Sequence, residues 1–71
     1  MNYSVTKAIQ LLEELARAKQ PVALRDLARM THLNKATAYR FLHSLWQKGL
    51  VQKVGSHGVY ALGPMLLALA E

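Results

Sequence analysis

The sequence predicts a mostly helical domain with one small β-hairpin, and three patterns in its 71 residues indicate this fold class. Apolar residues recur every three or four positions in three segments before residue 50, which is the spacing of half-buried helices. Two short β-prone runs follow, and an apolar run after Gly63-Pro64 indicates a last helix. The order helix, helix, helix, hairpin, helix predicts a winged helix-turn-helix over residues 1–63, with a two-stranded wing and a further helix at 64–71. An all-α bundle in which no hairpin forms is the alternative fold.

The first helix is expected over roughly Ser4 to Lys19, with Ser4 as its N-cap. One stripe is expected to face the core because its apolar members recur at helical spacing: Val5, Ala8, Ile9, Leu12, Leu15 and Ala16. Leu11 falls off this stripe, and two interpretations stay open: a scattered surface leucine, or a second apolar contact such as a dimer partner. Gln20-Pro21 ends the helix, because proline disfavours helical geometry in the residue before it.

A tight corner is predicted between a second helix, which starts at Leu24 and ends near Met30 or Thr31, and a third helix. The steep crossing of the two helices requires a small residue, which Ala28 supplies. The corner itself requires one residue with positive backbone φ, His32, and an apolar plug, Leu33. Glycine is more usual at the position of His32, but histidine adopts the left-handed conformation more readily than most residues. Before the second helix, Val22-Ala23 is expected to be extended, with a short strand that pairs later as one option.

The third helix is expected to begin after the N-cap Asn34 and to end at Gly49, which supplies a left-handed stop. Its inner side is apolar at spacings of three, four and seven: Ala38, Phe41, Leu42 and Leu45, with Trp46 at the edge. Its other side is polar, basic and aromatic, as expected of a face that meets a charged ligand.

The hairpin is expected to join the runs 50–54 and 59–62 through Gly55-Ser56-His57-Gly58, a typical turn composition. Alternation alone leaves open whether Leu50 or Val51 points inward. The last run, Met65 to Glu71, is apolar nearly all round, so we expect it either to pack on a partner or to belong to a longer helix.

The composition favours a polyanionic partner. Nine Lys and Arg against four Asp and Glu give a net charge of +5, which attracts nucleic acid or an anionic membrane surface, although a basic solubilising surface would look the same. The absence of cysteine excludes disulfides, zinc-finger ligands and a thiol nucleophile. No signal peptide or membrane-spanning run is evident, so we expect a soluble, cytoplasmic chain. The scattered histidines and acids lack metal or catalytic spacing, and neither a cofactor nor an enzyme is expected.

The outward side of the third helix predicts a DNA interface. Arg40 suits a bidentate contact to guanine or phosphate, and the helix N-terminus itself attracts phosphate. Each residue alone has an ordinary alternative: a solvated surface group, or for Thr37 a packing hydroxyl. Taken together, the predicted interface comprises Arg25 on the second helix, Asn34, Lys35, Ala36, Thr37, Tyr39, Arg40 and His43 on the third, and Lys53, Ser56 and His57 on the wing.

Three stretches of the chain resemble a known family: SVTKAIQLLEELA, LRDLARMTHLNKATAYRFLHSLWQKGLV and VYALGPMLLALA. Together they are similar, over roughly residues 4–70, to the N-terminal DNA-binding domain of IclR-type transcriptional regulators. The most specific part is the segment Tyr60 to Pro64, which in that family leads from the wing into a linker helix. The chain departs from the family at Asn34, where proline is frequent, and at His32, where glycine is usual.

The resemblance implies a bacterial or archaeal repressor or activator, with the recognition helix 34–48 in the major groove of double-stranded DNA. It implies a homodimer or higher assembly on a partly palindromic operator, paired through helices 4–19 and 64–71. It also implies that 64–71 starts a linker to a larger C-terminal domain that binds a small-molecule effector. Because 71 residues are too few for both domains, we expect an isolated domain or a fragment.

One alternative function belongs to a different class. A winged-helix module that binds another protein and never touches DNA would share the fold, and the apolar run from Met65 would be its contact. Association with a membrane surface finds little support, because no basic amphipathic helix is evident.

Overall fold

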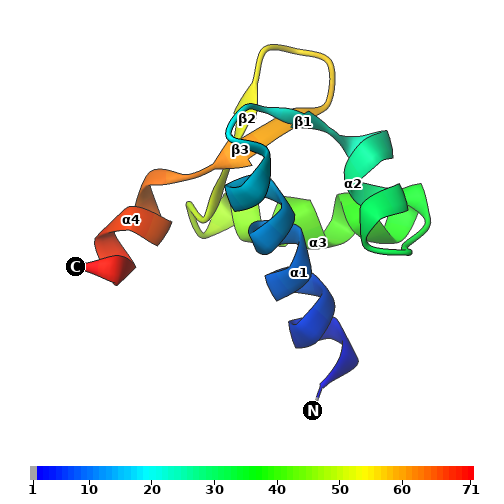
Figure 1. Ribbon diagram of the computed structural model, residues 1–71, viewed down its shortest axis with the longest axis horizontal. Coiled ribbons are helices and arrows are strands. Elements are labelled where there is room, and N and C mark those ends of the chain that lie inside the picture. The colour runs from blue at the N-terminus through cyan, green and yellow to red at the C-terminus, as the bar shows by residue number, and fades with distance from the viewer. Residues whose placement is uncertain (1) are drawn as a thin grey trace.

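The computed structural model describes residues 2–71, and these form the predicted winged helix-turn-helix (Figure 1). Its elements follow the chain in the order α1 (Tyr3–Ala18), β1 (Val22–Ala23), α2 (Leu24–Met30), α3 (Lys35–Gln47), β2 (Val51–Val54), β3 (Val59–Leu62) and α4 (Pro64–Ala70). The wing turn projects at the top of Figure 1, opposite the N-terminus, and α4 stands away from the other helices at the C-terminal side.

A small antiparallel sheet joins the wing to the body of the domain. Its strand order is β1-β3-β2, with Val22 opposite Tyr60 and Val51 opposite Leu62. The short extended run before α2 therefore does pair with a later strand, as one of the sequence interpretations had it. Because the hairpin forms, the all-α alternative is wrong.

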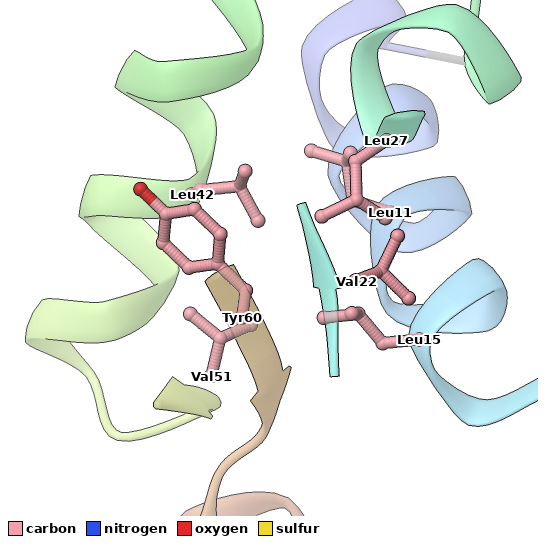
Figure 2. Packing of buried hydrophobic residues seen from close by; sticks show 7 residues of the cluster. All are labelled: Leu11, Leu15, Val22, Leu27, Leu42, Val51 and Tyr60. Atoms are coloured by element: carbon pink, nitrogen blue, oxygen red, sulfur yellow. The ribbon is translucent and has the colours of Figure 1, made fainter. Parts of the chain in front are cut away.

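The core lies between α1 and α2 on one side and α3 with the sheet on the other. Figure 2 shows its buried side chains pointing into this one space: Leu11, Leu15, Val22, Leu27, Leu42, Val51 and Tyr60. Every element except α4 contributes at least one of them. The open choice in β2 is also settled, since Val51 is buried while Leu50 is only half-buried.

The core-facing side of α1 differs from the predicted stripe. Leu11 is completely buried, so both interpretations of it as a surface or partner residue are wrong. Val5 and Ile9, which were expected in the core, are about half exposed at 51% and 48%. The reason is that α1 carries two overlapping series of apolar residues, and both have helical spacing. One series occupies positions 8, 11, 15 and 18, and the other occupies positions 5, 9, 12 and 16. The first series meets the core. Of the second, Leu12 is half-buried and packs against the core, while Val5, Ile9 and Ala16 form an exposed apolar face.

The bounds of α1 differ from the prediction by one residue at each end, and its N-cap differs by two. Its N-cap is Asn2, whose side-chain oxygen accepts a hydrogen bond from the Val5 amide at 3.1 Å, while Ser4 lies inside the first turn. The helix ends at Ala18, because Lys19 adopts the left-handed conformation with φ 61°.

A close backbone crossing connects α3, the sheet and α4. The Gly63 amide donates to the Leu50 carbonyl at 2.8 Å, and the Met65 amide donates to the Gly49 carbonyl at 3.0 Å. Gly49 has φ 78°, as its predicted role of left-handed stop requires. Beyond the crossing, α4 has no buried residue, and Leu67 and Leu69 are about 70% exposed. No helix within residues 2–71 has both the length and the apolar character to cross a membrane.

Candidate nucleic-acid interface

The corner between α2 and α3 has the predicted geometry. His32 adopts φ 58°, and the Leu33 amide donates to the Ala28 carbonyl at 2.9 Å. Thr31 is buried, and its hydroxyl donates to the Leu27 carbonyl at 2.8 Å. Ala28 and Ala38 are both buried, so the expectation of small or apolar residues at the helix crossing is confirmed. These directional bonds fix the direction in which the chain enters α3.

The first turn of α3 presents an uncompensated positive end. Asn34 caps the helix, with its side-chain oxygen accepting from the Thr37 amide at 2.8 Å, as predicted. The turn contains no acidic residue, and Lys35 and Ala36 are exposed. Helix N-termini attract anions through their free amides and the helix dipole. An exposed lysine at this end adds to that attraction.

Two further side chains extend the positive face along α3. Arg40 is exposed, and one of its guanidinium nitrogens donates to the hydroxyl of half-buried Thr37 at 3.4 Å. Within residues 2–71 the ion pairs are Glu14 with Arg17 and Asp26 with Arg29, so the charges of Lys35 and Arg40 are not offset by an acid. Arg40 has further guanidinium donors, which can meet an oxygen or a base edge.

An aromatic stack continues down the same helix toward the wing. The rings of Tyr39 and His43 stack at 5.9 Å between centroids, and His43 meets Trp46 at 5.4 Å. On β2, the Lys53 ammonium lies 4.2 Å from the centre of the Trp46 ring. His43 is half-buried, and within residues 2–71 its Nδ1 is buried without a hydrogen-bond partner. The His43 ring lies between the other two rings, and Tyr39 is 45% exposed.

Sequence reasoning placed Trp46 only at the edge of the apolar side and missed its contact with Lys53. The signal for the stack was present as aromatic or imidazole rings at positions 39, 43 and 46, a spacing that aligns them along one side of a helix.

The neighbouring core tyrosine, Tyr60, has its phenol pKa raised by burial and then by the nearby Tyr39, so this phenol stays neutral.

The wing and the start of α2 complete the set of predicted residues. Ser56 and His57 are exposed at the turn, with Oγ and Nε2 3.5 Å apart. Arg25 is exposed in the first turn of α2, next to Leu24, whose amide donates to the Gly58 carbonyl of the wing at 2.9 Å. This hydrogen bond joins the backbone at the start of α2 to the wing, which the sequence did not reveal.

Comparison with known proteins gives one consistent family. Residues 4–55 match the IclR helix-turn-helix domain. The transcriptional repressor IclR of Escherichia coli K12 is 38% identical over 60 residues, which cover 84% of this chain and 22% of that protein. The glycerol operon regulatory protein of Streptomyces griseus is 38% identical over 68 residues, covering 96% of this chain and 27% of that one.

Solved structures agree with the sequence match. A crystal structure of an IclR-type transcriptional regulator from Silicibacter sp. TM1040 superposes with a TM-score of 0.84 at 39% identity, covering 94% of this chain and 26% of that one. A transcriptional regulator from Rhodococcus sp. RHA1 gives a TM-score of 0.83 at 33% identity, covering 99% of this chain and 27% of that one. The chain spans about a quarter of the length of the curated relatives it matches. The relatives are transcriptional regulators, and the chain belongs to the IclR family as a helix-turn-helix DNA-binding domain.

Proposed function

We propose that the chain binds duplex DNA with α3 in the major groove and the wing against the backbone. The observation that supports this most strongly is the exposed, uncompensated positive charge of Lys35 and Arg40 around the N-terminal half of α3. Side chains at this end of a recognition helix reach base edges, while the amides of the first turn face a phosphate.

Each residue has a role that follows from its chemistry. Arg40 donates two parallel hydrogen bonds to guanine, and the Tyr39 ring packs against a sugar or a base. Lys35 neutralises a phosphate, and Ala36 leaves room for the close approach of the backbone. The other proposed contacts, which position the domain along the duplex, are Arg25, Asn34, Thr37, His43, Lys53, Ser56 and His57.

A second copy of the chain is the proposed partner on DNA. The outer face of α1 exposes Val5 and Ile9, and α4 exposes Leu67 and Leu69. An apolar groove of about 690 Å³ also lies between β2 and α4, lined in part by Gln52, Leu62 and Leu66. Exposed apolar surface of this kind is typical of a protein–protein contact. Two copies related by a two-fold axis would match a partly palindromic operator.

The relatives' names support the regulatory role. Two of the relatives are a repressor and an operon regulatory protein, so we infer repression or activation of an operon in the cytoplasm. A small-molecule effector would act only through a further domain, since these relatives are about four times as long as this chain.

Site selection from random duplex DNA, followed by affinity measurements, tests the proposal. Arg40→Ala is expected to weaken binding to the selected site by about 1–3 kcal/mol and to relax specificity at one base position. Arg17→Ala is the matched control, because it removes the same charge from α1, where Arg17 pairs with Glu14. Equal affinity of wild type and Arg40→Ala, or equal losses in both variants, would contradict the role of Arg40.

A protein-interaction module without DNA binding is the second candidate, and the exposed leucines of α4 favour it. A gel shift with random duplex at low salt separates the two functions. A basic DNA-binding domain binds random duplex at micromolar concentrations through its charge. No detectable binding at tens of micromolar would favour the protein-interaction module.

A further inference from the structure

One long-range contact joins α1 to the corner that precedes α3. The Lys7 ammonium on α1 donates a hydrogen bond of 2.5 Å to the Thr31 carbonyl, 24 residues further along the chain. Thr31 is the C-cap of α2, and the next residue is His32, where the chain turns left-handed into α3. The contact therefore acts on the peptide at which the corner begins, ahead of the Asn34 cap of the recognition helix.

This carbonyl differs from the others in the turn. The carbonyls of Leu27, Ala28 and Arg29 accept from backbone amides inside the corner. The Thr31 carbonyl accepts from Lys7. Carbonyls at a helix C-terminus carry its negative partial charge, so a cation there is favourable. Arg29, in the last turn of α2, pairs with Asp26, which leaves Lys7 as the cation at the cap itself.

The ammonium is also held from its own helix. Its nitrogen lies 5.8 Å from the centre of the Tyr3 ring, one turn earlier on α1, and the Lys7 side chain is half-buried. A half-buried lysine whose ammonium already meets a carbonyl and a ring is poorly placed to follow a DNA phosphate. Its position suits a side chain that fixes α1 relative to the end of α2.

We propose that Lys7 is a positioning residue for DNA recognition, which sets the angle of α3 relative to α1 by holding the Thr31 carbonyl and does not touch DNA. The inference rests on the proposed DNA binding by α3. A shifted recognition helix loses its base contacts first, because these need aligned hydrogen bonds. Contacts with phosphates tolerate a shift better, since they depend mainly on charge.

The experiment compares Lys7→Met, Lys7→Arg and Lys19→Met in the full chain. Lys7→Met keeps the length of the side chain and removes its donors, whereas Lys7→Arg retains donors and charge. Lys19→Met removes the same charge from an exposed position at the far end of α1. Dissociation constants are measured for the selected site and for random duplex over a range of salt concentrations, with thermal melting to verify folding.

Lys7→Met is expected to weaken binding to the selected site about tenfold, comparable to one mismatched base pair. Its affinity for random duplex and its salt slope should equal those of Lys19→Met, so the specificity ratio falls. Lys7→Arg should restore most of that ratio. Lys19→Met should keep the wild-type ratio within about twofold.

Three results would overturn the inference. Equal weakening on both DNAs with a salt slope lower by about one unit would make Lys7 a phosphate contact. A specificity ratio equal to that of Lys19→Met would show that the contact has no effect on recognition. Loss of the fold in Lys7→Met, or in Lys7→Arg at a temperature where wild type is folded, would make the contact one of stability. Failure of wild type to bind any duplex would instead refute the proposed function.

Discussion

The two ends of α3 are joined to different parts of the fold. At its N-terminal end, directional hydrogen bonds hold the corner, among them the cap from Asn34 and the bond from Leu33 to Ala28. At its C-terminal end, Gly49 packs closely against Gly63, and the amides of Gly63 and Met65 donate to the carbonyls of Leu50 and Gly49. The Trp46 ring meets Lys53 of β2. These contacts join the helix to the sheet and to α4.

The difference assigns different tasks to the two ends. Hydrogen bonds lose strength steeply when bent, so the corner defines the direction of the helix. The contacts at the far end join the helix to the sheet and to α4, away from the first turn that is proposed to read bases. Substitutions at the close crossing should therefore act mainly on stability, whereas substitutions at the corner should act on both stability and recognition.

The largest effect is expected from Gly63→Ala. A Cβ on Gly63 would lie 2.3 Å from the Gly49 carbonyl oxygen and 2.9 Å from the Leu50 carbonyl carbon, both of which belong to the backbone. Neither atom can rotate away, so the crossing must open, at a cost of about 1–3 kcal/mol or more in unfolding free energy. Chemical denaturation monitored by circular dichroism measures this loss.

Gly55→Ala in the wing turn is the matched control. Gly55 has φ 70°, and a Cβ there would meet no atom within 4 Å. The unfolding free energy of that variant should fall by only about 1 kcal/mol, which is the cost of placing a Cβ on a left-handed backbone. If the two variants lost equal stability, the close approach at Gly63 would not be what constrains the crossing.

The same contrast explains which features could be predicted from the sequence. The corner and the Asn34 cap depend on residues within a few positions of each other, so local rules predicted them correctly. The core face of α1 was wrong, because two apolar series with the same spacing coexist and only the packing against α3 and the sheet selects one. The roles of Lys7 and Gly63 could not be predicted, since their partners, Thr31 and Gly49, are distant in the sequence.

The Asn34 cap should show a smaller effect that reaches recognition. Asn34→Ala removes the acceptor of the Thr37 amide and should lower the unfolding free energy by about 1 kcal/mol. It should also weaken binding to the selected site, because the first turn of α3 loses its defined geometry.

Asn2→Ala tests the same chemistry away from the interface. Asn2 caps α1 with an equivalent hydrogen bond of 3.1 Å to the Val5 amide. Chain termini fray, so its loss should cost less than that of Asn34 and leave DNA binding unchanged. Weaker DNA binding by Asn2→Ala than by Asn34→Ala would contradict the special status of the corner.

The smallest effect is expected at the contact between Lys53 and Trp46. An exposed cation over an indole contributes about 0.5–1 kcal/mol, so Lys53→Met should lower stability by no more than that. A double-mutant cycle with Trp46→Leu isolates the pair, with thermal melting as the measurement. Because Trp46 is the one tryptophan in the sequence, its emission also reports directly on removal of the lysine.

Lys53 also tests whether the C-terminal end of α3 acts on recognition through the wing. If the wing contacts phosphate as proposed, Lys53→Met should weaken binding to selected and random duplex alike and lower the salt slope by about one unit. Lys48→Met is the matched control, since Lys48 is exposed at the end of the same helix. A change in specificity without a change in slope would instead mean that the ring contact, like the corner, sets the position of α3.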